Sequence, residues 1–183
     1  MPELDHVERA SIAVESATSL SELLQIVADA AQPFGFAHAA LARHVHVQSG
    51  LTEPDMVTNY PKAWHDLFEK RDYSLTSPVL AACQRHGGAI RWEELETIIP
   101  LTRIQREYLD EMRKLGMESG CTIASHMPDR PTISVHFVVS DGQPLQTRPF
   151  MLAILLGIAA GQRARTLWQS QLPQVQGSND ERL

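Results

Sequence analysis

Two neighbouring segments constrain the fold more than any other feature of this chain. Residues 121–127 and 132–139 have the length of strands, and the turn-forming residues 128–131, Pro-Asp-Arg-Pro, separate them. In the second segment one face carries Ile133, Val135, Phe137 and Val139, and the other carries Ser134, His136 and Val138. Because successive side chains of a strand point to opposite faces, the pattern predicts an antiparallel hairpin with one apolar face.

A third strand is expected at residues 37–47, followed by a turn region and a short strand at 55–60. One face of residues 37–47 carries Ala39, Leu41, Arg43, Val45 and Val47, and the other carries His38, Ala40, Ala42, His44 and His46. The alanines on the second face leave room for a bulky group to lie against the strand.

Helices are expected between these strands, and several have recognisable start and stop signals. Ser77-Pro78 combines an N-cap with proline in the first turn, and Gly87-Gly88 is expected to end that helix. Thr102 and Gln105 form a capping box. The amphipathic stripe that follows this capping box consists of Ile104, Tyr108, Met112 and Leu115. The remaining helices are expected from Ser19 or Ser21 to before Pro33, from Pro61 to about Lys70, and from Thr147 to about Trp168.

The expected order of elements along the chain is helices, strands, a block of helices, a hairpin and a last helix. This order is typical of an α+β fold, with an antiparallel sheet and helices on both faces. Residues 1–170 are expected to form one domain. Residues 171–183 are rich in Gln and Ser and resemble a linker.

The charge, the cysteines and the longest apolar run limit which classes of protein this chain can belong to. The net charge is −6, and Lys and Arg form no basic stripe, so this chain alone is not expected to bind DNA strongly. Cys83 and Cys121 are far apart and no secretory signal opens the chain, which favours free thiols in the cytoplasm. The longest apolar run, residues 150–160, is too short to span a bilayer.

Aromatic residues gather near one segment. Tyr60, Trp64 and Phe68 are spaced by four, so on a helix they share one face, and Trp92 lies further along the chain. Such a group suits a small, partly apolar ligand, because rings supply contact area while hydroxyl and indole groups supply direction. The same spacing is also typical of an ordinary core helix.

Several motifs in register carry a resemblance. Tyr60-Pro61, Trp64, Phe68, Ser77-Pro78-Val79, Trp92 and the Gly116–Gly120 segment keep the order and spacing of the autoinducer-binding domain of LuxR-type quorum-sensing regulators. The resemblance in element order extends over about residues 5–170. It implies an α/β/α sandwich with a five-stranded antiparallel sheet, and an N-acyl homoserine lactone bound between the sheet and one helical layer.

The resemblance also implies roles for individual residues. Trp64 would donate to the lactone carbonyl, Tyr60 would hydrogen-bond an acyl carbonyl, and Trp92 would wall the lactone ring. Ser134 would contact the acyl region, and Gly120 would allow close packing at the start of a strand. The full set of candidate ligand-binding residues is Tyr60, Trp64, Phe68, Ser77, Val79, Trp92, Thr122 and Ser134.

Two residues depart from the family pattern. Ser77 stands where members usually have an Asp that accepts the ligand's amide N–H, and Phe68 stands where they usually have Tyr. Serine caps a helix about as well as aspartate but lacks the charge that strengthens the hydrogen bond. The helix start is therefore expected to survive the change at Ser77, while the contact with an amide weakens.

Regulators of this type also carry a C-terminal helix-turn-helix domain, which these 183 residues do not include. The chain is therefore either the sensory half of a transcription factor or a regulator without a DNA reader. The second kind would act as a dimer with a full-length LuxR-type protein. The apolar helix containing residues 150–160 either contributes to a dimer surface, homodimeric or heterodimeric, or simply covers the sheet.

Catalytic and metal-binding alternatives have weak support in the sequence. The eight histidines include His44 and His46 on one expected strand face, and His126 and His136, which the hairpin can bring face to face. Zinc needs three or four convergent ligands, so hydrogen-bonded or solvated histidines are favoured, with no metal or cofactor. Neither Cys83 nor Cys121 lies in an activating turn, so an enzyme is not expected.

Overall fold

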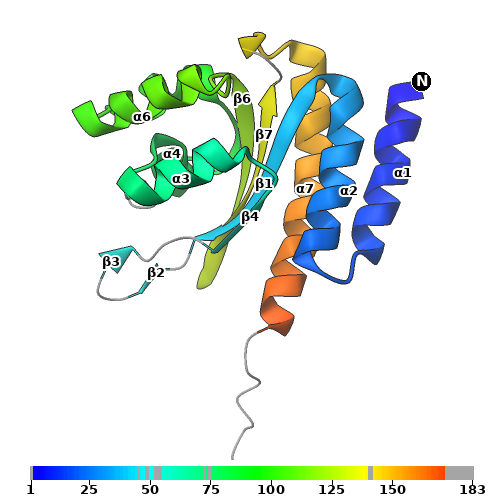
Figure 1. Ribbon diagram of the computed structural model, residues 1–183. Helices are drawn as coiled ribbons and strands as arrows, with labels where there is room; N and C mark the ends of the chain where they lie inside the picture. Colours follow the sequence, from blue (N-terminus) through cyan, green and yellow to red (C-terminus); the bar gives the residue numbers. More distant parts are fainter. Residues whose placement is uncertain are drawn as a thin grey trace, which may run out of the picture.

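The computed structural model describes residues 2–44, 46–47, 50–51, 55–71, 73, 76–139 and 142–171. A five-stranded antiparallel sheet in the order β4-β1-β7-β6-β5 forms its centre, with helices on both faces (Figure 1). This confirms the α+β class and the sandwich. The expected linker lies, apart from Gln171, outside the described residues. The strands of the sheet are β1 (Phe36–His44), β4 (Asp55–Thr58), β5 (Gly88–Arg91), β6 (Gly120–Met127) and β7 (Arg130–Val139).

The predicted hairpin is present, with a tighter turn than expected. Strand β6 continues to Met127 and pairs there with Arg130, so only two residues remain in the turn. Asp129 adopts a positive φ of 55°, a conformation that Asp tolerates better than most residues. The register of the sheet places Ala40 beside His136, and His136 beside Thr122.

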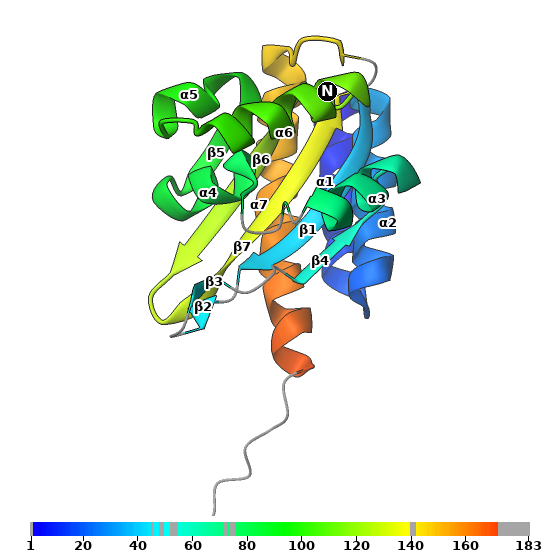
Figure 2. The ribbon, with the colours of Figure 1, turned by 60° about the vertical axis from the view of Figure 1, so that its left-hand side comes forward.

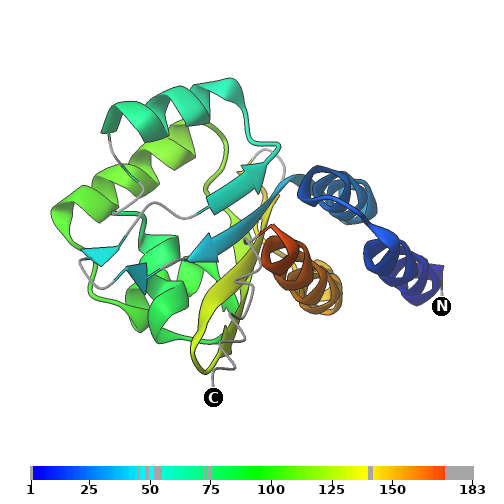
Figure 3. The same cartoon turned by 90° about the horizontal axis from the view of Figure 1, so that it is seen from below.

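One face of the sheet is covered by α2 (Leu20–Ala31) and α7 (Thr147–Ser170), and α1 (Pro2–Ser16) packs on these two helices; the three are here called the long-helix layer (Figures 1 and 3). The apolar face of β7 packs against it, and Leu41, Val135 and Phe137 are completely buried there. Helix α1 was not expected from the sequence. Among residues 5–16, whose burial is described, it contributes Val7, Ala10 and Val14 to the buried surface, too sparse an apolar stripe to stand out among its polar residues.

The opposite face is covered by short helices, here called the short-helix layer (Figure 2). Its predicted caps are present: Ser77 Oγ accepts from Leu80 N at 3.4 Å, and Thr102 and Gln105 cap each other's backbone at 3.2 and 3.0 Å. The helix expected to begin at Pro61 begins at Lys62. The layer consists of α3 (Lys62–Arg71), α4 (Pro78–Arg85), the 3-10 turn η2 (Trp92–Glu94), α5 (Leu95–Ile98) and α6 (Arg103–Lys114).

Two strand expectations need correction. Gly88, expected to be only a helix stop, also begins β5, which pairs with β6 as an edge strand. The strand expected over residues 37–47 ends at His44, and His46–Val47 forms β2, which pairs with β3 (Gly50–Leu51) in a separate two-stranded sheet. His44 and His46 therefore belong to different sheets. Local propensity gave no signal for either break, because strand pairing is a long-range choice.

Helix α7 is long and apolar enough to cross a membrane by length and composition, although its apolar run 150–160 alone is not. Core helices of soluble proteins meet the same criterion, and α7 packs on β6 and β7 with Leu156, Ala160 and Ala164 buried. Its arginines hold backbone carbonyls: Arg163 Nε donates to Ala17 O at 2.8 Å, and Arg165 donates to Pro131 O and Ser125 O. Met151, Leu155 and Ile158 remain exposed on its outer face.

Candidate ligand-binding site

A cavity of about 20 Å³ lies between the sheet and the short-helix layer. This is room for about one water molecule. Six of the eight candidate residues line the cavity, and among the described residues that line it there is no carboxylate, lysine or arginine. The lining residues are Met56, Tyr60, Trp64, Phe68, Ser77, Val79, Leu80, Trp92, Tyr108, Met112 and His136.

The aromatic residues of α3 and its approach pack on one another at the cavity. Tyr60 meets the Trp64 ring edge-on, with 4.9 Å between centroids, and Phe68 stacks on Trp64 at 4.5 Å. Trp64 is only 4% exposed. The spacing of four thus brings Trp64 and Phe68 onto one face of α3, and Tyr60, two residues before the helix, packs beside them. The three rings serve both as core and as cavity wall.

Trp92 reaches the cavity from η2 and is held by the sheet. Its indole N–H donates to Thr122 Oγ1 at 2.9 Å. A Cβ atom at Gly120 would lie 3.1 Å from the Trp92 ring and would also collide with the carbonyl of Phe137. The glycine therefore permits the close approach that the sequence suggested for the start of this strand.

A chain of buried hydrogen bonds continues from Trp92 across the sheet. Thr122 Oγ1 lies 2.9 Å from His136 Nδ1, His136 Nε2 lies 2.8 Å from Ser134 Oγ, and Ser134 Oγ lies 2.7 Å from His44 Nε2. An indole nitrogen can only donate, so Thr122 Oγ1 accepts from Trp92. The other three bonds join hydroxyls, which can both donate and accept, to imidazoles, so their donors are set by the imidazole tautomers.

The electrostatics of this chain favour a neutral imidazole at His136. Burial, with a smaller contribution from His44, lowers the pKa of His136 to about 3. The hydroxyls of Thr122 and Ser134 are completely buried and already bonded to their neighbours. These two candidates form the floor beneath the cavity rather than its lining, because the cross-strand register turns their polar groups toward one another.

Five lining residues were not assigned to the site from the sequence: Met56, Leu80, Tyr108, Met112 and His136. Tyr108 and Met112 belonged to the expected amphipathic stripe of α6, and both are buried. Ile104, on the same expected stripe, is 47% exposed. The helical period was the available signal for Tyr108, but it does not say which layer of the core a stripe will meet.

The side chain of Tyr108 approaches two of the candidate residues. Burial raises the pKa of Tyr108 to about 12, while hydrogen bonding from Ser77 and Trp64 opposes that rise. Burial also raises the pKa of Tyr60 well above its usual range, and the nearby Tyr108 hydroxyl adds to the shift. The polar tips of Tyr60, Trp64, Ser77 and Tyr108 therefore converge at the helical side of the cavity.

The arrangement offers little for catalysis. Burial raises the pKa of both Cys83 and Cys121 to about 12, so neither thiol ionises readily as a nucleophile must. His126 bonds to Thr132 at 2.8 Å, and His136 is opposite Thr122 instead. Within the described residues, no three His, Cys, Asp or Glu side chains converge in a way that suits a metal ion.

Comparison with known proteins identifies the fold. The chain has a TM-score of 0.70 and 17% identity with an N-acylhomoserine lactone dependent LuxR family transcription factor, CepR2 of Burkholderia cenocepacia, covering 93% of this chain and 99% of that one. SdiA of Escherichia coli has a TM-score of 0.71 and 18% identity, and the match covers 93% of this chain and 72% of that one. An SdiA structure in complex with octanoyl-rac-glycerol has a TM-score of 0.71 and 16% identity, and the match covers 90% of this chain and 66% of that one.

At these identities the solved structures establish only a shared fold. No match to a curated protein sequence was found. The sequence itself supplies the family, because residues 19–162 match the model of the autoinducer binding domain, a ligand-binding rather than a catalytic family. This span includes the sheet, the short-helix layer and every residue that lines the cavity. The chain belongs to the autoinducer-binding domain family of LuxR-type regulators.

Proposed function

We propose that this domain senses an N-acyl homoserine lactone or a related small amphipathic signal, bound between the sheet and the short-helix layer. The observation that carries the proposal is the convergence of Tyr60, Trp64 and Ser77 on one cavity beneath an aromatic wall. Two proteins of the same fold have names that point the same way: one is lactone dependent, and one was solved with octanoyl-rac-glycerol.

In this proposal the polar head of the signal is recognised from the helical side. Trp64 donates to the lactone carbonyl and Tyr60 bonds an acyl carbonyl, while Trp92 packs against the lactone ring. The hydroxyls of Thr122 and Ser134 hold the sheet floor in place, since their hydrogen bonds are directed to His136 and His44. Val79 and Phe68 contribute apolar contact along the acyl chain.

A signal of this class needs far more than 20 Å³, so the lining must rearrange on binding. Phe68 and Met56 are only half-buried, and Met112 is flexible, so movement of these side chains is less costly than movement of the sheet. Ordering such a pocket around a ligand uses part of the binding free energy. We therefore expect moderate affinity rather than permanent retention of the signal.

Thermal unfolding in the presence of N-octanoyl homoserine lactone or octanoyl glycerol tests the proposal. A ligand at a hundred times its Kd stabilises the folded state by about 2.7 kcal/mol, which raises Tm by several degrees in a domain of this size. Octanoate is the control, because it has the chain without the head group. No shift with either compound up to millimolar concentration would reject an acyl signal.

The second candidate function is that of a ligand-independent regulator without its own DNA reader, acting as a heterodimer with a full-length LuxR-type protein. The nearly filled cavity favours it, since the core is complete with the chain's own side chains. Met151, Leu155 and Ile158 on α7 offer an apolar contact surface. Co-expression with a full-length relative and measurement of mixed dimers by native mass spectrometry tests it, and recovery of homodimers or monomers alone would contradict it.

Both candidates place the domain in the cytoplasm as a binding protein without a cofactor. Cys83 and Cys121 are free thiols, as is usual in a reducing compartment. The net charge of −6 disfavours direct contact with DNA by this chain. Dimerisation, as a homodimer or with a LuxR-type partner, would then bring the domain to its target.

A further inference from the structure

Tyr108 enters the cavity from α6, on the side opposite the sheet. Its side chain is buried, at 5% exposure, and lines the cavity together with Trp64 and Ser77. Tyr73 packs edge-on against its ring with 4.9 Å between centroids, which fixes the ring on its outer side. The phenol thus occupies space that would otherwise belong to the cavity.

The hydroxyl of Tyr108 lies beside Trp64, which the proposed function assigns to the lactone carbonyl, and beside Ser77, which stands where the family's amide-binding Asp usually stands. The hydrogen-bonding groups of Trp64 and Ser77 lie close enough to the Tyr108 hydroxyl to oppose the rise in its pKa, and all three residues line the same cavity. The indole N–H of Trp64 can only donate, so the Tyr108 oxygen accepts from it as a ligand carbonyl would. A hydroxyl can also donate, so toward Ser77 the same group can take the part of a ligand N–H.

We propose that Tyr108 is a built-in occupant of the signal site, which completes the polar contacts of Trp64 and Ser77 and must be displaced before a signal can bind. The inference rests on the proposed function for the identity of the guest, but its claim about Tyr108 concerns this chain alone. Tyr108 then determines which ligands the site accepts, because a ligand must fill the volume of the displaced ring and replace the contacts of its hydroxyl.

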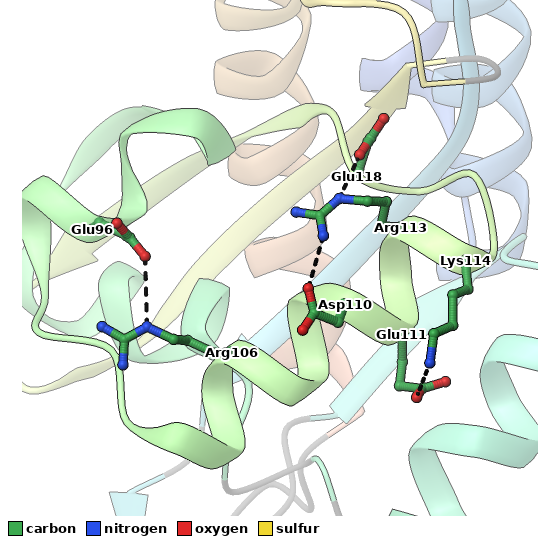
Figure 4. A network of polar contacts seen from close by, with 7 residues as sticks. All are labelled: Glu96, Arg106, Asp110, Glu111, Arg113, Lys114 and Glu118. Atoms are coloured by element: carbon green, nitrogen blue, oxygen red, sulfur yellow. Dashed lines mark hydrogen bonds and ion pairs between the residues drawn. The ribbon is translucent and has the colours of Figure 1, made fainter.

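The outer side of α6 is compatible with such a displacement. Its ties to neighbouring elements run through exposed ion pairs: Arg106 with Glu96 at 3.9 Å, and Arg113 with Glu118 at 2.9 Å (Figure 4). Exposed ion pairs contribute little to stability. These ion pairs therefore add little to the cost of moving α6 when Tyr108 is displaced.

An internal occupant lowers the apparent affinity for any ligand, because only the molecules in which the site is open can bind. The apparent Kd is the intrinsic Kd divided by the fraction of open molecules. Removing the occupant should therefore tighten binding rather than weaken it, the reverse of what is expected for a residue that contacts the signal. Tyr108→Ala removes both ring and hydroxyl. Tyr108→Phe removes only the hydroxyl, so it keeps the packing should the alanine variant fold poorly.

The test uses an uncharged apolar dye, N-phenyl-1-naphthylamine, and N-octanoyl homoserine lactone on the whole chain. We expect Tyr108→Ala to bind the dye with a clear rise in fluorescence where the unmodified protein does not, and to bind the lactone about tenfold or more tightly. Tyr108→Phe should tighten lactone binding several-fold, because the Trp64 N–H no longer has the Tyr108 oxygen as an acceptor and is available to the ligand carbonyl. The control Leu109→Ala truncates a neighbouring α6 side chain outside the cavity lining and should change neither.

The outcomes separate this inference from the proposed function. Dye binding by Tyr108→Ala alone, with no lactone or octanoyl glycerol bound by any variant, supports the occupant and rejects the acyl signal. Equal lactone affinity in the unmodified protein and in both variants supports the signal and overturns the occupant. Weaker lactone binding by Tyr108→Phe also overturns it, because Tyr108 would then be a ligand contact.

Discussion

Trp92 and Thr122 are joined by a hydrogen bond of 2.9 Å from the indole nitrogen to the hydroxyl oxygen. The bond connects the wall of the cavity to the floor, and through Thr122 to His136 and the rest of the buried chain. Trp92 is therefore oriented by the sheet, and its only polar group faces Thr122. Its expected role as an apolar wall for a lactone ring is compatible with this geometry.

Replacement of Thr122 by valine tests the importance of that connection. The substitution keeps the shape but leaves the Trp92 N–H and His136 Nδ1 without their partner in a fully buried setting. We expect a loss of about 1–3 kcal/mol in the free energy of unfolding, measured by urea denaturation. Thr122→Ser keeps the hydroxyl and should lose clearly less, and equal stability of Thr122→Val and the unmodified protein would contradict the chain.

The depressed pKa of His136 predicts a pH dependence of stability. In the unfolded chain this group titrates near pH 6.5, whereas burial keeps it neutral in the fold down to about pH 3. Below pH 6.5 the unfolded state therefore binds a proton that the folded state does not. The free energy of unfolding should fall by up to about 1.4 kcal/mol per pH unit from this group as pH decreases from 6.5, and its full contribution is present above 6.5.

Urea denaturation between pH 7.5 and 5 measures this slope, at pH values where most carboxylates remain ionised. His136→Gln should show a shallower slope, whatever its absolute stability. His86→Gln replaces an exposed histidine and is the control. Parallel slopes for His136→Gln and the unmodified protein would show that His136 is not the group responsible.

Two glycines in α7 should respond in opposite ways to alanine. A Cβ at Gly157 would lie 2.9 Å from Ile123 Cγ1, whereas a Cβ at Gly161 would make only an ordinary contact, 3.7 Å from Val135. Alanine is favoured over glycine in a helix by about 1 kcal/mol. We therefore expect Gly161→Ala to raise the Tm measured by circular dichroism. Gly157→Ala should lower the Tm or leave it unchanged, because the clash with Ile123 opposes the helix preference of alanine. A rise of equal size in both would mean that α7 is not packed this closely on β6.

Trp64→Phe tests the donor that the proposed function assigns to the lactone carbonyl. The ring volume is largely kept, but the carbonyl of the ligand loses its partner. We expect affinity for N-octanoyl homoserine lactone to fall by about 1–3 kcal/mol, measured by calorimetry. Phe68→Leu changes an apolar lining residue and should have a smaller effect. Unchanged affinity in Trp64→Phe would show that the indole N–H does not bind the lactone carbonyl.

Ser77→Asp tests the departure from the family pattern. Aspartate caps a helix as well as serine does, so α4 should keep its start, and a carboxylate accepts an amide N–H more strongly than a hydroxyl does. We expect affinity for N-octanoyl homoserine lactone to rise by about 1 kcal/mol relative to octanoyl glycerol, which has no N–H. If the ratio of the two affinities stays constant in competition titrations, Ser77 does not face the amide.

The sequence by itself determined the local features of this domain. The period of two in β7 and the capping signals of α4 and α6 depend on neighbours in the chain, and each was confirmed. The spacing of Trp64 and Phe68 likewise placed two rings on one face of α3, with Tyr60 packing beside them from before the helix. Periodicity also separated the two faces of β7 correctly, because side-chain direction in a strand is fixed by the backbone.

Only the tertiary structure decided how those faces meet. The pairing of Thr122 with His136 directs two candidate hydroxyls into the sheet floor, and the packing of α6 brings Tyr108 to Trp64 and Ser77. Strand β5 and the division of residues 37–47 also depend on long-range pairing. The physical reason is the same in each case: a local pattern fixes which way a side chain points, but register and helix packing, set by contacts between distant segments, fix what it touches.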